Sequence, residues 1–320
     1  MTARTEENGP AGADAPGFRH ELYPYGGPSA FLNGALSFIE DALSDGESVV
    51  VAVDPDKQEK LRAELADDGS GPRVSFMDTA ALGRNPGRLI PAWQDWVAKS
   101  VSDGFPVRGI SEPPWKGRTP GERGELQYHE WLVNLAFARS AWWLLCPYDT
   151  TAVEPAALDT ARRCHPFRLS EGTHGPNPDN TDEPWSFPDL TDACDPDQEL
   201  VYRAGELSAV RDKVTACAGR HGLEGERLRE LLVAATEVAA NSIKYGGGHG
   251  TLRTWAEGDD LVCEFHDAGH IRDPLAGRTR PAPRQTGGRG MWLVHQLCDL
   301  VQIRSTAEDG TTIRLHTSLR

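Results

Sequence analysis

The C-terminal part of this 320-residue chain is organised around the stretch Glu230-Leu-Leu-Val-Ala-Ala-Thr-Glu237-Val-Ala-Ala-Asn241-Ser-Ile-Lys244-Tyr-Gly246-Gly-Gly248. Its interior is rich in Leu and Ala, contains no Pro and stops at a glycine run, which predicts a helix that ends at the glycines. Glu237 and Asn241 are spaced i, i+4 and Lys244 follows at i+7, so the three side chains project from one face. Taken alone, this polar stripe fits the solvated side of an amphipathic helix as well as it fits a binding site.

The composition predicts a soluble globular protein with two domains of ordinary size, because 38% of the residues are hydrophobic and 25% are charged. No apolar run approaches the roughly 18 residues of a membrane span, and the polar N-terminus lacks the apolar core of a signal peptide. The six cysteines are scattered and form no Cys-x-x-Cys pair, as is typical of buried thiols in a reducing compartment. We therefore expect a cytoplasmic protein that does not bind a membrane.

The formal net charge of −15 is unevenly distributed along the chain. Residues 197–320 hold 16 Lys and Arg against 17 Asp and Glu, which leaves −14 on residues 1–196. A chain this acidic lacks the electrostatic footprint of a protein that binds nucleic acid directly. If the protein affects transcription, we expect it to act through a protein partner.

The order of sequence patterns predicts four regions. Residues 1–16 are rich in Gly, Ala, Glu and Pro and are expected to be disordered. Residues 17–168 alternate strand and helix signals, which predicts an α/β domain with a Rossmann-like parallel sheet covered on both sides. Residues 169–196 have the hydrophilic composition of a linker. Residues 197–320 show helices first and strands after, which predicts an α+β sandwich with helices on one face of a mixed sheet.

Individual elements follow from hydrophobic periodicity and from Gly and Pro punctuation. In the first domain the predicted helices are 30–43, 57–65, 88–101 and 127–140, and the predicted strands are 48–53, 73–77, 107–110 and 142–146. In the second domain the predicted helices are 210–221, 230–245 and 291–299, and the predicted strands are 251–255, 260–266, 301–305 and 311–316.

Two glycine-containing turns follow the opening helix. The strand at 260–266 ends at Asp267-Ala-Gly269, which places a carboxylate and a flexible residue at the end of a strand. The run Gly287-Gly-Arg-Gly290 directly precedes a predicted helix, and glycines at a helix start let phosphate approach the backbone N–H groups. A lone glycine cluster is more often a turn than a phosphate site. A carboxylate-bearing helix, an Asp-x-Gly turn and a glycine-led helix in this order are much more specific.

These three motifs resemble the ATP-binding domain shared by gyrase, Hsp90, histidine kinases and MutL, in its RsbW-type anti-sigma-factor kinase branch. The resemblance covers roughly the last 120 residues and implies a Bergerat-type sandwich that binds ATP with Mg²⁺. It implies that Asn241 holds Mg²⁺ and that Glu237 is the catalytic carboxylate that accepts the proton of the attacking hydroxyl. It further implies that Asp267 binds the adenine amino group, with Gly269 allowing the base to approach.

The same resemblance assigns the phosphates and the edge of the adenine site to further residues. Residues 270–286 are expected to form a lid over the phosphates, and this lid loop is locally cationic because its arginines outnumber its single aspartate. At one position the chain departs from the pattern, because Ile271 stands where the family usually has a second glycine. The remaining expected nucleotide contacts are Lys244, Gly287, Gly288, Arg289, Gly290 and Thr312.

A two-component histidine kinase is a rival interpretation, since it shares this ATP site. Such an enzyme needs a phospho-accepting His on a long dimerising helix just before the ATP domain. The preceding segment offers only His221, in Gly-Arg-His-Gly, which is typical of a helix end. The anti-sigma-factor branch is therefore favoured.

In the N-terminal domain, polar and aromatic residues cluster at the ends of predicted strands and on one apolar helix. In a doubly wound sheet the carboxyl ends of the strands form the ligand crevice. His20, His129 and Cys146 have the chemistry of metal or haem ligands, but no pair has ligand spacing. The tryptophans of this region are more often core than ligand cage. The candidate ligand-binding residues are His20, Glu112, Trp115, His129, Glu130, Asn134, Cys146 and Tyr148.

His20-Glu21, Gly-Ile-Ser-Glu-Pro-Pro-Trp115 and Asp149 after Cys-Pro-Tyr resemble, in this order, the MEDS sensory domain. The resemblance spans roughly residues 17–168 and implies that this domain senses a small organic molecule. The whole chain is then expected to be a cytoplasmic anti-sigma factor that binds Mg·ATP and a sigma factor and phosphorylates Ser or Thr of an antagonist protein. The alternative is a non-catalytic switch in which ATP only shapes a partner surface, and Ile271 slightly favours it. The RsbW-type resemblance also implies a homodimer.

Overall fold

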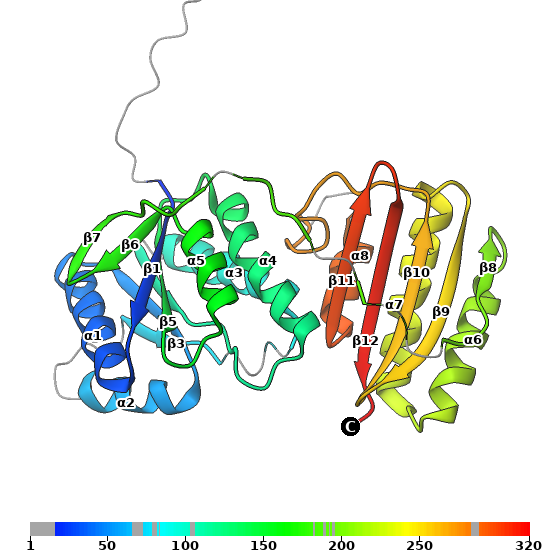
Figure 1. The fold of residues 1–320 in the computed structure, drawn as a ribbon, viewed down its shortest axis with the longest axis horizontal. Helices are drawn as coiled ribbons and strands as arrows, with labels where there is room; N and C mark the ends of the chain where they lie inside the picture. The colour runs from blue at the N-terminus through cyan, green and yellow to red at the C-terminus, as the bar shows by residue number, and fades with distance from the viewer. Residues whose placement is uncertain are drawn as a thin grey trace, which may run out of the picture.

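The computed structural model describes residues 17–65, 73–78, 82, 84–102, 106–181, 183–187, 190–191, 193, 196–282 and 288–320. The predicted disordered tail, residues 1–16, lies outside these ranges. Two separate sheets divide the molecule into an N-terminal and a C-terminal half that lie side by side (Figure 1). In the described residues no helix is long and apolar enough to cross a membrane.

The N-terminal half is built on a seven-stranded sheet with the order β3-β2-β4-β5-β1-β6-β7. Neighbouring strands are parallel throughout, except that β7 runs antiparallel to β6. This arrangement confirms the predicted α/β class. The strands are β1 (Arg19–Tyr25), β2 (Ser48–Ala52), β3 (Val74–Phe76), β4 (Val107–Ser111), β5 (Trp143–Asp149), β6 (Phe167–Ser170) and β7 (Thr173–Pro176).

Helices cover both faces of this sheet because its central strands are apolar on both sides. On β2, Val49 and Val51 join one core, whereas Val50 joins the other. Helices α1 (Pro28–Ser44) and α2 (Pro55–Leu65) pack over the first core. The opposite face carries α3 (Leu89–Ser102), α4 (Pro120–Phe137) and α5 (Pro155–Cys164), with the short 3-10 helix η1 (Pro86–Arg88) before α3.

Three local predictions in this half need correction. Helix α4 begins at Pro120 and not at residue 127, because Thr119 and Glu122 form a reciprocal capping box there. Strand β5 continues through Pro147 to Asp149, and His20 lies inside β1 and not before it. The amphipathic helix α5 was not predicted.

The predicted linker is partly folded. Its residues 169–170 complete β6, and Thr173–Pro176 form β7, which pairs with β6, so the first sheet continues past residue 168. Hydrophilic composition did not reveal this hairpin, because an edge strand needs little apolar surface. Farther along, the carbonyl oxygen of Thr191 accepts a hydrogen bond from Arg314 at 2.6 Å, so this segment lies against the second sheet.

The C-terminal half is a five-stranded sheet with three helices on one face, which confirms the predicted sandwich. The sheet was expected to be mixed, but all four strand pairings are antiparallel, because β9–β10 and β11–β12 are joined by tight turns. The strand order is β11-β12-β10-β9-β8. The elements are β8 (Leu200–Arg203), α6 (Leu207–Arg220), α7 (Gly225–Tyr245), β9 (His249–Glu257), β10 (Asp260–Asp267), α8 (Arg289–Leu297), β11 (Leu300–Thr306) and β12 (Gly310–Ser318).

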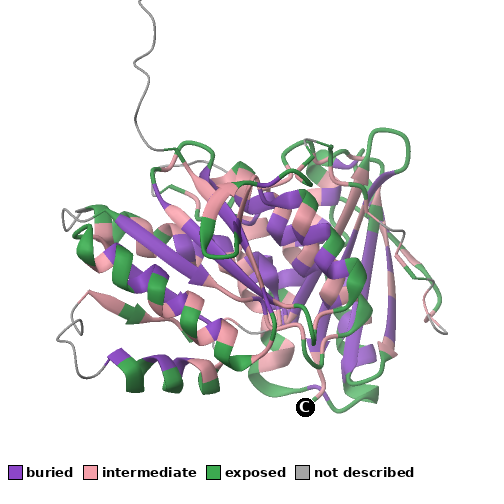
Figure 2. Ribbon diagram, turned by 60° about the vertical axis from the view of Figure 1, so that its left-hand side comes forward, coloured by how far each residue is buried: buried purple, intermediate pink, exposed green. Residues whose placement is uncertain are grey.

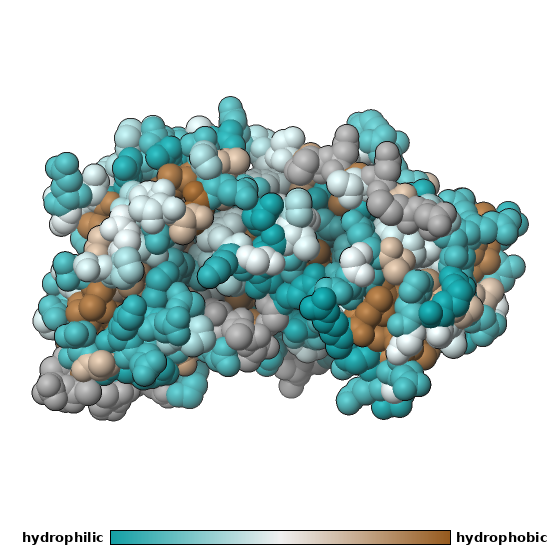
Figure 3. All heavy atoms as spheres, turned by 60° about the horizontal axis from the view of Figure 1, so that its bottom comes forward, coloured by the Kyte–Doolittle hydropathy of each residue, from teal (hydrophilic) through white to brown (hydrophobic). Residues whose placement is uncertain are grey.

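Burial follows this layering. Figure 2 shows the sheets largely buried at the centre, with the exposed residues on the outer faces of the helices. On the surface shown in Figure 3 hydrophilic side chains dominate and hydrophobic ones form separate small groups. The three cores, one on each face of the first sheet and one in the C-terminal half, are therefore covered by their own helices.

The two halves meet through buried polar contacts at the end of α8. The Arg88 guanidinium donates to the carbonyl oxygens of His295, Gln296 and Cys298 at 2.9, 2.9 and 2.8 Å. The Asn85 side-chain amide donates to the carbonyl oxygens of His295 and Cys298 at 3.0 and 3.2 Å. The last carbonyls of a helix lack partners within it, and a cation suits the negative end of the helix dipole. The N-terminal half thus supplies the C-terminal cap of α8.

Close approach at this contact depends on glycine. A Cβ added at Gly87 would lie 2.1 Å from Nδ1 of His295, so any larger residue would push the two halves apart. Arg84 adds a second connection, because it donates to Glu122 at 2.5 Å and to both carboxylate oxygens of Asp260 at 2.8 and 2.7 Å.

Candidate functional site

Helices α7 and α8 bring the predicted carboxylate stripe next to the glycine-led helix start. A Cβ added at Gly290 would lie 2.6 Å from Oε2 of Glu237 and 3.6 Å from Nδ2 of Asn241. A larger residue at position 290 would displace the end of the Glu237 side chain. The stripe on α7 therefore faces the first turn of α8, which excludes the interpretation of Glu237 and Asn241 as a purely solvated face.

The Asp-x-Gly turn closes the other end of the same site. The Asp267 carboxylate accepts a hydrogen bond from the Gly269 N–H at 2.8 Å. A Cβ at Gly246 would lie 2.3 Å from the carboxyl carbon of Asp267, and a Cβ at Gly269 would lie 2.9 Å from the Tyr245 carbonyl oxygen. Backbone and carboxylate are thus packed so closely that glycine is required at both positions.

A cavity of about 290 Å³ lies between α7, the Asp267 turn, the lid loop and the start of α8. Gly288 has a left-handed φ of 79° and is the N-cap of α8, and no side chain caps this helix. A glycine-led helix start of this kind lets an anion approach the backbone N–H groups. Of the predicted nucleotide contacts, the cavity wall contains Asn241, Asp267, Gly269, Gly288 and Gly290.

This set of residues fits a nucleotide with Mg²⁺. An amide oxygen from Asn241 suits a hard cation that prefers oxygen ligands. The glycine-led start of α8 suits phosphate, and the Asp267 carboxylate beside the close backbone approach at Gly269 suits an amino-bearing base. The remaining wall is apolar, with Val238, Met291 and Ile313, which is typical of a small-molecule site.

Other predicted contacts lie elsewhere. Thr312 pairs with His266, whose Nδ1 lies 3.1 Å from the Thr312 hydroxyl, and Thr311 lines the cavity instead. Alternate strand residues point to opposite faces, which is why Thr311 lines the cavity and its neighbour Thr312 does not. The Lys244 ammonium is exposed and lies 4.8 Å from the ring centroid of Tyr245. Arg289 is exposed and outside the cavity wall, and Gly287 lies outside the described residues.

The described part of the lid loop is held by the N-terminal half. Arg278 is 2% exposed and donates to Oε2 of Glu125 on α4 at 2.8 Å, and Arg280 lies 2.8 Å from Asp95 on α3. Arg304 on β11 donates to the other oxygen of Glu125 at 2.9 Å. Arg278 is therefore not free to attract phosphate, because it forms an ion pair with a buried carboxylate of the N-terminal half.

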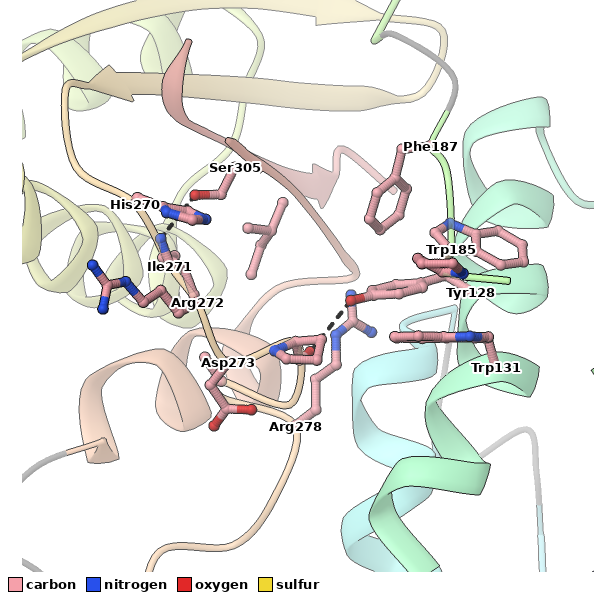
Figure 4. A pocket seen from close by; sticks show the side chains of 14 residues that line it. Tyr128, Trp131, Trp185, Phe187, His270, Ile271, Arg272, Asp273, Arg278 and Ser305 are labelled. Atoms are coloured by element: carbon pink, nitrogen blue, oxygen red, sulfur yellow. Dashed lines mark hydrogen bonds between the residues drawn. The ribbon is translucent and has the colours of Figure 1, made fainter. Parts of the chain in front are cut away.

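The same contact borders a second pocket of about 450 Å³ between the two halves (Figure 4). Figure 4 shows Arg278 reaching from the lid loop toward Tyr128 of α4, and its guanidinium carbon lies 5.1 Å from the centroid of that ring. The Tyr128 hydroxyl donates to the Pro274 carbonyl oxygen at 3.5 Å. The pocket shares Ile271 with the first cavity, and the Ile271 N–H donates to Ser305 at 2.8 Å. Helix α4 is thus in direct contact with the lid loop.

In the N-terminal half, the candidate sensory residues divide between two places. The first is a buried cluster of His20 on β1, Glu130 on α4, Cys146 on β5 and His165 after α5, whose ligand-type atoms all lie within 4.8 Å of one another. Asn134 belongs to its surroundings, because its Oδ1 lies 3.1 Å from Nδ1 of His20.

Burial controls the ionisation of this cluster. It lowers the pKa of His20 to about 4 and raises that of the Cys146 thiol well above its usual range. Burial by itself would raise the pKa of Glu130. The contacts with His165 and His20 outweigh burial and hold this pKa well below its usual range. The Tyr148 ring packs edge-on against His165 at 5.9 Å, and burial raises the pKa of its hydroxyl well above 10.

The second place is a pocket of about 950 Å³ at the carboxyl ends of β2, β4 and β5. Glu112 and Trp115 line it, as predicted for strand ends in a doubly wound sheet. Glu112 accepts hydrogen bonds from Lys57 at 2.5 Å and from Tyr25 at 2.6 Å. Burial nevertheless raises the pKa of Glu112, and the pKa of Tyr25 is raised by burial and by this carboxylate.

His129 joins neither place. Its ring is buried on α4, and burial lowers its pKa to about 4. The prediction missed His165 and Lys57. His165 directly follows helix α5, which was not predicted. The signal that could have identified it as a site residue was its position close to the start of β6. Lys57 was assigned only to a helix, although it lies in the first turn after β2, where side chains reach the strand-end crevice.

Comparison with known families agrees with this division. Residues 19–166 match the family described as MEDS, the MEthanogen/methylotroph, DcmR Sensory domain. Residues 201–317 match the family described as Histidine kinase-like ATPase domain. The chain thus joins a MEDS domain to a histidine kinase-like ATPase domain. No match was found among curated proteins.

Proposed function

We propose that this fusion of a MEDS domain with a histidine kinase-like ATPase domain is a cytoplasmic anti-sigma factor that regulates transcription. Its C-terminal domain binds Mg·ATP and a sigma factor, and phosphorylates Ser or Thr of an antagonist protein. The MEDS domain controls this activity in response to a small molecule. The five described cysteines are free thiols, which supports a reducing compartment.

The observation that carries the proposal is that Glu237 and Asn241 lie beside Gly290, and that Asn241 and Gly290 line the cavity that also contains Asp267. Bound Mg·ATP would supply an activated phosphoryl group. Asn241 would hold the metal, and the Asp267 carboxylate would orient the base. Glu237 would accept the proton of an incoming hydroxyl.

The geometry disfavours a two-component histidine kinase. Helix α6, the described helix that precedes α7, has 14 residues, and His221 is its C-cap residue. A phospho-accepting His would need to project from the middle of a long dimerising helix. The anti-sigma-factor branch has no such requirement.

The interface suggests how the MEDS domain reaches the ATP site. Glu125 and Tyr128 of α4 contact the lid loop at Arg278 and Pro274. A shift of α4 would therefore change the position of the lid without involving the linker. Coupling of this kind needs two arrangements of one element, each favoured by a different ligand state.

A non-catalytic switch is the second candidate. It is favoured by the anchoring of Ile271 to Ser305 and of Arg278 to Glu125, which restrains the part of the lid that a kinase would close over phosphates. In this case ATP would shape a partner surface and no phosphoryl group would move.

The nucleotide site is tested by titrating the full-length protein with Mg·ATP. Asn241→Ala should weaken binding by at least about tenfold, or about 1.4 kcal/mol. Lys244→Ala is a matched control, because Lys244 lies one turn along α7 but outside the cavity wall, and it should leave the affinity nearly unchanged. Unchanged affinity in Asn241→Ala would remove Asn241 from the site.

Transfer of label from ATP to a partner protein distinguishes the kinase from the switch. A pull-down from the native organism should recover a sigma factor and identify an antagonist. Label should then move from ATP to a Ser or Thr of that antagonist. ATP binding without any label transfer would leave the switch and exclude the kinase, whereas a pull-down without any sigma factor would contradict the anti-sigma-factor proposal.

A further inference from the structure

We propose that His20, Glu130, Cys146 and His165 bind one Zn²⁺ ion in the core of the MEDS domain. This site is independent of the ATP site. Its four ligands come from β1, α4, β5 and the residue after α5, so the ion would connect elements that are far apart in sequence.

The distances among the ligand atoms fit a tetrahedral ion. Nε2 of His20 lies 3.3 Å from Sγ of Cys146 and 3.6 Å from Oε2 of Glu130, and Nε2 of His165 lies 3.4 Å from the same Glu130 oxygen. With bond lengths of 2.0–2.3 Å, the ligands of tetrahedral Zn²⁺ are separated by about 3.3–3.8 Å. These three distances fall in that range, and since all four ligand atoms lie within 4.8 Å of one another, an ion fits between them once the remaining pairs close up.

Both histidines are oriented to present Nε2. Nδ1 of His20 lies 3.1 Å from Oδ1 of Asn134, and Nδ1 of His165 lies 2.7 Å from the Ala161 carbonyl oxygen. In each case the acceptor fixes the proton on Nδ1 and leaves a lone pair on Nε2, directed into the cluster. Metal-ligating histidines are held in this way by outer-shell acceptors.

The cluster is buried and incompletely satisfied. His20, Glu130, Cys146 and His165 are each at most 3% exposed. Within the described part of the chain, Oε2 of Glu130 and Nε2 of His165 have no hydrogen-bond partner. Buried polar atoms without partners are costly, and each calls for an explanation such as an unseen ion. An ion bound to both atoms would remove this cost.

The donor set selects the metal. Two neutral imidazoles, one thiolate and one carboxylate carry a total charge of −2, which a divalent cation neutralises. Nitrogen and sulfur ligands in a tetrahedral arrangement favour Zn²⁺ over Mg²⁺ or Ca²⁺. Four protein ligands leave no open position, so the expected role is structural or regulatory.

Helix α4 gives this ion a route to the lid loop. Glu130, the carboxylate ligand, lies on the same helix as Glu125, which pairs with Arg278 of the lid loop. Binding or loss of the ion would change how firmly α4 is held against the sheet. The lid contact would then depend on metal occupancy.

The test is a titration of metal-free full-length protein with Co²⁺, which replaces Zn²⁺ and reports its ligands by absorption. We expect one equivalent per chain, the intense visible bands of a tetrahedral ion and a near-ultraviolet charge-transfer band from the Cys146 thiolate. Zn²⁺ should displace Co²⁺ and abolish both. Wild-type protein that shows no such bands, or only the weak bands of an octahedral ion, would overturn the proposal.

Variants assign the ligands. Cys146→Ala and His165→Ala should each weaken Co²⁺ binding by about 100-fold or more, and Cys146→Ala should also remove the charge-transfer band. Cys263→Ala is the matched control, because Cys263 is an equally buried thiol in the other domain, and it should bind Co²⁺ like the wild type. Unchanged binding in Cys146→Ala and His165→Ala would contradict the assignment.

Thermal unfolding keeps the test decisive if a variant folds poorly. Zn²⁺ at a large excess over its Kd should raise the Tm of the wild-type protein by several degrees, and a chelator should reverse this shift. Mg²⁺ at the same concentration should not. A wild-type Tm that is unaffected by Zn²⁺ and chelator would exclude the site even without data from variants.

Discussion

In the candidate ATP site, the carboxylate of Glu237 lies directly beside Gly290. Glu237→Gln keeps the shape and length of the side chain but removes a base. We expect Mg·ATP affinity within about threefold of the wild type, and phosphoryl transfer reduced by about 10²–10⁴-fold, the usual contribution of general base catalysis. Single-turnover transfer to the antagonist measures this. Equal rates in the variant and the wild type would show that Glu237 is not the base.

The buried His295 at the domain contact makes stability depend on pH. Burial and the charges of Arg278 and Arg88 hold the pKa of His295 well below 6.5. The unfolded chain therefore binds a proton near pH 6.5 that the folded chain does not, so stability falls as the pH drops below about 6.5, by up to about 1.4 kcal/mol per unit. Denaturant unfolding at pH 7.5 and 5.5 should show a smaller loss in His295→Gln. An equal loss would mean that other groups cause the effect.

Helix α4 links the two halves through Glu125, a fully buried carboxylate shared by Arg278 and Arg304. Glu125→Gln removes the carboxylate that accepts from the buried Arg278 guanidinium and from Arg304, which should destabilise the protein by about 3–5 kcal/mol. Amide hydrogen exchange in residues 271–282 should become faster, because the lid loop loses its anchor.

The control for this change is Asp95→Asn. Asp95 pairs with Arg280 of the same loop, but both side chains are about half exposed, so the loss should stay below about 1 kcal/mol. Equal amide exchange rates of the lid loop in the two variants would show that α4 does not restrain it.

Across the whole molecule, Arg88 and Asn85 cap α8 from the other half, so the two domains should unfold together. Wild-type protein is expected to show one calorimetric transition. Arg88→Ala leaves three carbonyl groups without this partner and should cost about 3 kcal/mol. The transition should then divide into two. Arg220→Ala, an exposed pair with Asp197, should preserve the single transition, and two transitions in the wild type would refute the coupling.

Most elements of the fold could be predicted because their causes are local. The spacing of apolar residues predicted α1 and α7, and the glycines around Asp267 and Gly290 pointed to the cavity that they line. The prediction was wrong where a local signal lies outside the apolar periodicity. The start of α4 is an example, because its capping box precedes the apolar run.

The sequence by itself determined the two fold classes, the order of their elements and the motifs of the ATP site, since periodicity and glycine spacing act over a few residues. Only the tertiary structure decided that Thr311 and not Thr312 faces the cavity, and that His165 joins His20. It also decided that Arg278 pairs with Glu125, which is 153 residues away. Such partners are chosen by the packing of whole sheets and helices, and no pattern local to either residue encodes the choice.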